Sequence, residues 1–139
     1  RFLMLTIADI VAEHAGREGP LLPILHDVQK AFGHVSEDAI RTIANALNLT
    51  RAEVYGVVSF YHDFRKEPES RPIIKLCRAE ACKARGVEAL VPIAEGQDRV
   101  KVETIYCLGL CSVGPAAMIG DTVHARVDAH RFAELISAA

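Results

Sequence analysis

The first half of the chain carries apolar residues at helical spacing, with capping residues where helices would begin. The clearest apolar stripe lies in residues 20–33 and consists of Leu21, Leu22, Leu25, Val28 and Phe32. Ser36 and Thr50 are typical N-caps, and Thr50 with Glu53 has the spacing of a capping box. With a further start at Thr6, these signals predict four helices in the first half of the chain.

The pattern changes after residues 67–72, where two prolines and several charged residues predict a stiff, exposed linker. The predicted strands that follow are 73–76, 100–105, 116–119 and 122–127. The other predicted elements are a helix that runs to about Leu90, a turn region at 92–98 and a last helix beginning at Asp128. The predicted fold class is therefore α+β, with an N-terminal four-helix bundle in residues 1–66 and a sheet domain in residues 73–139.

All four cysteines fall in the sheet domain, as two close pairs. Four residues separate Cys77 from Cys82, and three separate Cys107 from Cys111. Cys77 ends the first predicted strand, which is where open α/β sheets usually place their sites. Cys82 lies at the start of the next helix, where free N–H groups favour a thiolate. Two close pairs with no other cysteine predict one four-thiolate site.

Three kinds of chemistry compete for four such thiols. A disulfide framework suits small secreted chains, whereas a chain of 139 residues that is 50% hydrophobic can bury a core without cross-links. Structural zinc accepts four thiolates, but its ligands are commonly paired two residues apart. A [2Fe–2S] cluster is wider than one ion and takes two thiolates on each iron. The wide spacing favours the cluster and leaves zinc and disulfides as alternatives.

Composition and charge argue against several functions. The formal net charge is −2 with both signs mixed, which predicts no nucleic-acid partner. The third and fourth helices resemble a helix-turn-helix, but residues 51–61 offer one basic side chain, Arg51, against Glu53. No apolar run approaches the ~20 residues that span a bilayer. Free cysteines at one site, without a visible export signal, predict a cytoplasmic protein.

The residues of the second cysteine pair carry a family resemblance. A Cys-x4-Cys pair followed by Tyr-Cys-Leu-Gly-Leu-Cys at 106–111 and Gly-Pro at 114–115 is similar to the thioredoxin-like [2Fe–2S] ferredoxin family. This family includes the 24-kDa-type subunit of respiratory complex I. The resemblance implies that residues 73–139 form a thioredoxin-like [2Fe–2S] domain with a role in electron transfer. It also suggests a cis peptide bond before Pro115.

The same resemblance implies how the ligands are shared. Cys77 and Cys82 would hold one iron, and Cys107 and Cys111 would hold the other. No Gly-rich dinucleotide loop is present, so the chain is expected to have no catalytic site of its own. A thioredoxin-type disulfide enzyme would need Cys-x-x-Cys, and both pairs are spaced differently. A zinc-stabilised interaction module is the alternative without redox chemistry.

Three less specific sequence segments, residues 19–26, 46–54 and 59–65, are most similar to the gamma subunit of soluble, NAD-dependent, molybdenum-containing formate dehydrogenase. This implies a partner subunit that binds FMN and NAD, and a larger molybdenum and iron–sulfur subunit in the same complex. The equivalent subunit of an NADH:quinone oxidoreductase or of an NAD-linked hydrogenase is the alternative. The resemblance further implies that the helical bundle attaches to a larger subunit. The aromatic side chains near the end of the fourth helix, Phe60, Tyr61 and Phe64, suit either a buried anchor there or the core of the bundle.

Two further features concern the cysteines' surroundings. The interval between the cysteine pairs is shorter than in relatives, which places the second strand of a thioredoxin sheet in doubt. Arg78, Lys83 and Arg85 flank the first pair, and cations there would raise the potential of an anionic cluster. The simpler interpretation of these three residues is solvated surface charge.

Overall fold

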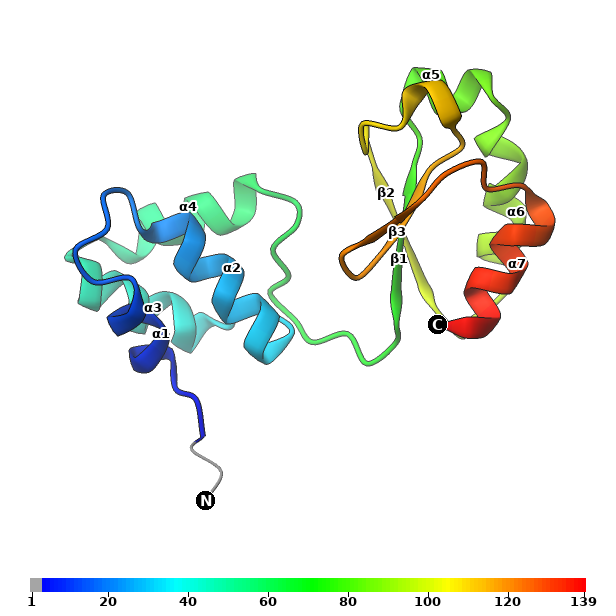
Figure 1. The fold of residues 1–139 in the computed structure, drawn as a ribbon. Helices are drawn as coiled ribbons and strands as arrows, with labels where there is room; N and C mark the ends of the chain where they lie inside the picture. The colour runs from blue at the N-terminus through cyan, green and yellow to red at the C-terminus, as the bar shows by residue number, and fades with distance from the viewer. Residues whose placement is uncertain (1–3) are drawn as a thin grey trace. The chain divides into compact units, whose positions relative to one another are not determined.

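The computed structural model describes residues 4–139, and the chain forms two compact units. The first unit runs to Glu69 and the second comprises Ser70–Ala139 (Figure 1). Each unit has its own cluster of buried apolar side chains.

Helices occupy the four segments where apolar periodicity predicts them. They are α1 (Ile7–Glu13), α2 (Leu21–Phe32), α3 (Glu37–Leu47) and α4 (Arg51–Phe60). Thr6, Ser36 and Thr50 accept hydrogen bonds from the first turns of α1, α3 and α4, as expected of N-caps. Gly33 and Asn48 end α2 and α3 in the left-handed conformation, with φ of 79° and 55°. The helices enclose one core of Ile10, Ile24, Leu25, Val28, Val35, Ala39, Ile40, Ile43, Ala44, Val54, Val58 and Phe64.

The segment after α4 is fastened to α2 by the side chain of Gln29. Its Nε2 donates to the carbonyl oxygen of Asp63, and its Oε1 accepts from the backbone N–H of Arg65 at 2.6 Å. Phe64 between them is buried and lies 4.9 Å from the ring of His26, centroid to centroid. Phe60, by contrast, is 74% exposed. Of the aromatic side chains near the end of α4, Phe64 is therefore a core residue of this unit, whereas Phe60 lies on its surface.

The capping box of α4 provides the first prediction. The hydroxyl of Thr50 accepts from the N–H of Glu53, and the Glu53 carboxylate accepts from both the N–H and the hydroxyl of Thr50. The Thr50 N–H, and then its hydroxyl, lower the pKa of Glu53. We expect Thr50→Ala to lower the free energy of unfolding by about 1 kcal/mol. Chemical denaturation near neutral pH measures this loss.

The same box has a defined pH dependence. A carboxyl group whose pKa is lowered by folding stabilises the protein above its unfolded pKa, and this contribution is lost as the pH falls through the folded value. The difference between Thr50→Ala and the parent chain should therefore shrink in acid. Thr42→Ala is the matched control, because the Thr42 hydroxyl donates to the Asp38 carbonyl within α3 and caps nothing. An equal loss for both variants would contradict the role of the box.

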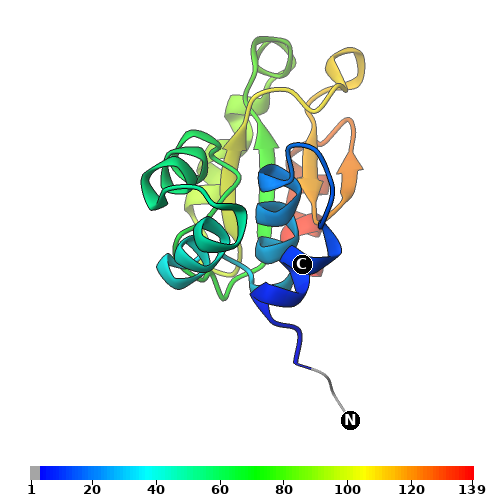
Figure 2. The same ribbon diagram turned by 90° about the vertical axis from the view of Figure 1, so that its left-hand side faces the viewer.

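The second unit is built on a four-stranded sheet with the order β2-β1-β3-β4. Its strands are β1 (Ile73–Cys77), β2 (Lys101–Ile105), β3 (Ala117–Ile119) and β4 (Thr122–His124). β1 pairs with β2 in parallel and with β3 antiparallel. β3 and β4 form a hairpin around Gly120, with Ile119 paired to Thr122. Figures 1 and 2 show α6 (Val91–Glu95) and α7 (Ala129–Ala138) on the same side of the sheet.

The connection from β1 to β2 corrects two predictions. In place of one helix to about Leu90, α5 (Glu80–Ala84) is followed by the 3₁₀ helix η1 (Val87–Leu90). The break comes at Gly86, whose φ of 93° is open to glycine and strained for other residues. The predicted turn region at 92–98 begins instead with α6, because Pro92 is tolerated in the first turn of a helix. Residues between η1 and β2 are all described and include no strand. The second strand of a thioredoxin sheet, which the short interval between the cysteine pairs had placed in doubt, is therefore absent there.

The core of the second unit lies under one face of the sheet. Its buried residues are Ile74, Leu76, Cys77, Cys82, Val87, Leu90, Val100, Ala116, Ala117, Val127, Phe132, Leu135 and Ile136. Phe132 is fully buried, and Asp128 caps α7 by accepting from the N–H of Arg131. The Gly114–Pro115 peptide bond is cis, which confirms the hypothesis for this position. Helices with a four-stranded mixed sheet confirm the α+β class.

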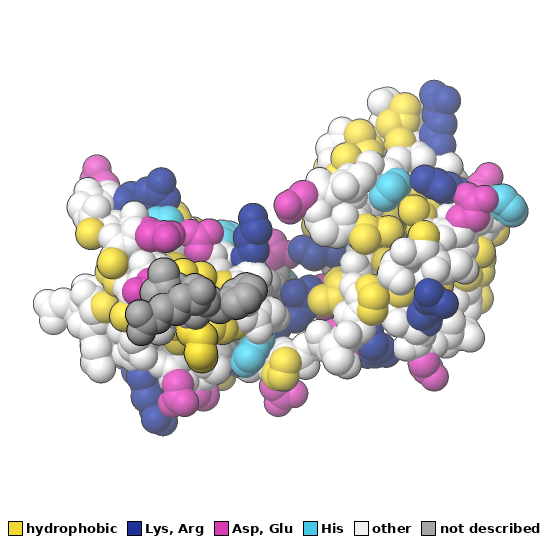
Figure 3. Space-filling model, turned by 60° about the horizontal axis from the view of Figure 1, so that its bottom comes forward, with side chains coloured by type: hydrophobic (Ala, Val, Ile, Leu, Met, Phe, Trp, Pro, Cys, Tyr) yellow, Lys and Arg dark blue, Asp and Glu magenta, His cyan; other side chains and the backbone are white. Residues whose placement is uncertain are grey.

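Two surface features agree with the composition. On the face seen in Figure 3, acidic and basic side chains are interspersed over both units. Within residues 4–139, no helix has the length and apolar character needed to cross a lipid bilayer.

Candidate metal centre

The strand pairing brings the first and third cysteines together. Cys77 is the last residue of β1, and its register partner on the parallel strand β2 is Ile105, two residues before Cys107. The N–H of Arg78 donates to the Ile105 carbonyl at 2.9 Å, which extends the ladder past the end of β1. The N–H of Cys107 then donates to the Sγ of Cys77 at 3.3 Å. The carboxyl ends of two parallel strands thus place a cysteine from each pair side by side.

Cys82, the second cysteine in sequence, lies in α5 and is contacted by the segment that follows Cys111. Cys82 is 2% exposed. A Cβ built on Gly114 would lie 3.0 Å from the Cys82 Sγ, so the backbone of Gly114 passes directly against this sulfur. The N–H of Cys77 donates to the Ala116 carbonyl at 3.0 Å. Residues 114–116 therefore contact both members of the first pair.

The second pair lies at the surface. Cys107 and Cys111 are exposed, and their Sγ atoms are 3.6 Å apart. Cys107 has a φ of 82°, a left-handed conformation that residues with a side chain rarely adopt. Gly109 follows with a φ of 77°, and its N–H donates to the Cys107 Sγ at 3.4 Å. The loop between the two cysteines is thus shaped so that a backbone donor, the N–H of Gly109, points at sulfur.

The surroundings of the thiols shift their pKa values in different directions. Burial raises the pKa of Cys77, but N–H groups of Ala79, Cys107 and Leu108 and the Cys82 thiol outweigh it, so that the pKa of Cys77 is lowered. Burial is also the main reason why the pKa of Cys82 is raised. The thiol of Cys107 raises the pKa of its neighbour Cys111. A thiolate therefore forms more easily at Cys77 than at Cys82 or Cys111, and four thiolates at once would require a compensating positive charge such as a metal ion.

The cations beside the first pair have different partners. Arg78 makes a bidentate ion pair with Glu88, with contacts of 3.0 and 2.8 Å. Lys83 lies 3.7 Å from a Glu80 carboxylate oxygen. The Nε of Arg85 donates to the carbonyl oxygen of Cys111 at 3.2 Å. Of the predicted flanking cations, Arg85 therefore has a contact with the second cysteine pair.

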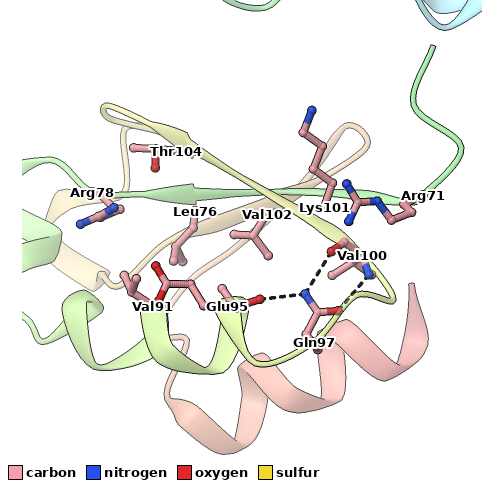
Figure 4. Close-up of a pocket in the computed structure, with 11 residues that line it drawn as sticks. Arg71, Leu76, Arg78, Val91, Glu95, Gln97, Val100, Lys101, Val102 and Thr104 are labelled. Carbon is pink, nitrogen blue, oxygen red and sulfur yellow. Dashed lines mark hydrogen bonds between the residues drawn. The ribbon is translucent and has the colours of Figure 1, made fainter. Parts of the chain in front are cut away.

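A hollow of about 280 Å³ lies between the sheet and α6 (Figure 4). Leu76 and Val102 point from the strands toward Val91, and the Gln97 amide is bonded to the backbone of Ala94 and Val100. None of the residues that line this hollow is a cysteine. Because the Gln97 amide is satisfied by the backbone of the α6–β2 connection, we assign no ligand to this hollow.

All four predicted site residues thus gather at one end of the sheet, as a buried pair and an exposed pair. Within residues 4–139, no three or more His, Cys, Asp or Glu side chains converge closely enough to hold a single metal ion. The sequence reasoning missed two contacts, the packing of Gly114 on Cys82 and the hydrogen bond from Arg85 to Cys111. The Gly-Pro phrase marks the position of the first contact but does not reveal its partner, and no local pattern marks the second.

The sheet, its helices and the thiols at the carboxyl ends of parallel strands define a thioredoxin-like domain with a cysteine-rich site. The thioredoxin-like [2Fe–2S] ferredoxin family matches residues 7–139, so the chain belongs to this family. The resemblance inferred from the cysteine phrases is thereby confirmed.

Several relatives are similar to this chain over most of their own length. The NADP-reducing hydrogenase subunit HndA of Solidesulfovibrio fructosivorans is 30% identical, over 80% of this chain and 71% of that protein. An NADH-quinone oxidoreductase subunit of Rhizobium meliloti is 29% identical, over 90% of this chain and 81% of that protein. Its counterpart in the NADH-quinone oxidoreductase of Escherichia coli K12 is 30% identical, over 78% of this chain and 72% of that protein.

A solved structure shares the fold. The crystal structure of NAD⁺-reducing [NiFe]-hydrogenase in the H₂-reduced state matches with a TM-score of 0.71 and 29% identity. The match covers 85% of this chain but 22% of the hydrogenase chain. This chain therefore corresponds to about a fifth of that larger polypeptide.

Proposed function

We propose that this chain is an electron-transfer subunit that carries one [2Fe–2S] cluster on Cys77, Cys82, Cys107 and Cys111. When bound, such a cluster supplies reversible one-electron chemistry. The observation that carries the proposal is the meeting of two cysteine pairs at one end of the sheet, in a chain of the [2Fe–2S] ferredoxin family.

The donor geometry of the exposed pair fits two ligands of one metal. Two thiolates that share a tetrahedral metal at about 2.3 Å lie about 3.8 Å apart. The Cys107 and Cys111 sulfurs, at 3.6 Å, have this separation without any rearrangement. The family match favours a [2Fe–2S] cluster, with two irons, over a single zinc ion. We infer that each pair holds one iron.

The chain's own residues provide the environment of this group. N–H groups of Cys107 and Gly109 donate to sulfur, and such donors stabilise negative charge on a thiolate. Gly114 closes the site beside Cys82, which keeps the first pair away from water. The second pair is exposed and provides the side from which a redox partner approaches.

We further propose that the partner is a subunit that binds FMN and NAD, in a soluble NAD-dependent formate dehydrogenase with a larger molybdenum and iron–sulfur subunit. The phrases in residues 19–26, 46–54 and 59–65 support this choice. The four-helix bundle in residues 1–66 would serve as the attachment unit for the larger subunit. The names of the relatives favour a second candidate, the equivalent subunit of an NADH-quinone oxidoreductase or a hydrogenase.

The cluster assignment is tested on anaerobically purified chain by iron, zinc and acid-labile sulfide analysis with a visible spectrum. We expect about two irons and about two sulfides per chain, and a red-brown colour that dithionite bleaches. One zinc per chain without sulfide or colour, after expression with ample iron, would overturn the proposal in favour of a structural zinc module.

The choice of complex is tested by affinity purification from the source cells. The captured complex is assayed for NAD reduction with formate and with hydrogen, and for quinone reduction with NADH. Formate-dependent NAD reduction supports the formate dehydrogenase. Activity restricted to hydrogen or quinone would instead support the second candidate and leave the cluster assignment intact.

A further inference from the structure

The structure separates Arg85 from the other cations of the site. The side chains of Arg78 and Lys83 have carboxylate partners, Glu88 and Glu80. In the described part of the chain, Arg85 has no ion pair, and its side chain is bonded to backbone instead. Its charge is therefore not neutralised by a neighbouring carboxylate, whereas that of Arg78 is neutralised by Glu88.

Arg85 contacts the site at three places. Its N–H donates to the carbonyl of Cys82 at 3.2 Å, where α5 ends. Its Nε donates to the carbonyl of Cys111 at 3.2 Å. Its Cδ lies 3.4 Å from the position that a Cβ on Gly114 would take. Arg85 thus joins the segment of the buried pair to the segment of the exposed pair, across 26 positions in sequence.

We propose that Arg85 is a positioning residue that joins the two cysteine segments and raises the reduction potential of the cluster. This inference rests on the proposed function. Reduction adds one negative charge to the site, so a cation held near Cys111 favours the reduced form. Because Arg85 is exposed, salt should screen its effect, which gives the charge contribution a signature of its own.

The side-chain chemistry allows charge and positioning to be separated. Arg85→Gln removes the charge, whereas Arg85→Lys keeps it but replaces the planar guanidinium by a compact ammonium. Lys83→Gln is the matched control, because it removes a cation two residues away, in α5, that pairs with Glu80 and not with the second cysteine pair. All variants are made in the full chain.

The first readout is the midpoint potential of the loaded cluster, from an EPR-monitored redox titration at low and at high salt. We expect Arg85→Gln to shift the potential to more negative values, more at low salt than at high salt. Arg85→Lys should retain most of the parent value, and Lys83→Gln should shift it less than Arg85→Gln. Equal potentials in the parent chain and Arg85→Gln would overturn the charge contribution.

The second readout is the rate at which a chelator removes iron. We expect faster loss in both Arg85 variants than in Lys83→Gln, with an unchanged thermal midpoint of the metal-free chain. Loss no faster than in the control, or faster loss accompanied by a collapse of that midpoint, would overturn the positioning role. If the parent chain binds iron and sulfide normally, either of these results counts against the role of Arg85 alone and leaves the proposed function in place. A parent chain without iron or sulfide would overturn the proposed function, and this inference with it.

Discussion

Replacing Cys77 by alanine is expected to abolish cluster binding while leaving the fold in place. Cys77 ends the central strand β1, is 2% exposed and accepts the N–H of Cys107 through its sulfur. No further cysteine exists to substitute for it, because the chain has four in all. Iron and sulfide per chain should fall from about two of each to near zero. The visible absorbance and the EPR signal should disappear together.

The controls for this variant separate ligation from folding. Ser112→Ala changes a neighbour of the exposed pair that is not a proposed ligand, and it should retain the full iron content. Cys111→Ala removes an exposed thiol, and it should lose the cluster as completely as Cys77→Ala although the two positions differ in burial. Far-UV circular dichroism of the metal-free forms should be unchanged. Full iron and sulfide in Cys77→Ala would refute the ligand assignment.

Gly114→Ala is expected to weaken the cluster site through a single steric contact. Gly114 has φ −67° and ψ 170°, an extended conformation open to any residue, so the substitution causes no backbone strain. The new Cβ would lie 3.0 Å from the Cys82 sulfur and 3.4 Å from Arg85 Cδ. Cys82 is buried and has little room to retreat, so its sulfur should move from its position. We expect lower iron content and faster iron release to a chelator.

Gly56→Ala makes the same chemical change where nothing crowds the new methyl group. Gly56 lies within α4, and a Cβ there would meet no atom within 4 Å. Alanine is favoured over glycine inside a helix by about 1 kcal/mol, so this control should stabilise the chain and leave the iron content unchanged. If Gly114→Ala bound and released iron as Gly56→Ala does, the contact with Cys82 would have no part in the site.

Local signals in the sequence predicted more of the first unit than of the second. Ser36, and Thr50 with Glu53, specify helix starts within a few residues, and the structure confirms both of them. The chain after Cys82 was less predictable, because a glycine within an apolar helical pattern permits a break without requiring one, and the structure breaks the helix at Gly86 with a φ of 93°. The burial of Phe64 in the core, with Phe60 at the surface, similarly depends on the distant side chains of His26 and Gln29.

In the candidate site too, some features follow from local sequence signals and others depend on contacts between distant residues. Spacing predicted one site for all four cysteines, and the parallel pairing of β1 with β2 explains how Cys107 comes to lie beside Cys77. The contact of Arg85 with Cys111 joins residues that no local pattern relates. Such non-local contacts follow from the fold, and sequence spacing alone does not reveal them.

The pairing of β1 with both β2 and β3 also sets the order in which the protein matures. Cys77 meets Cys107 through one pairing, and Ala116 through the other, so neither contact exists before the sheet has formed. Pairings between distant parts of a chain form late, because the intervening loop must first be closed. A nascent chain therefore presents its thiols as two unrelated pairs. The machinery that delivers iron and sulfide would meet a folded acceptor, and the cell must keep these thiols reduced until then.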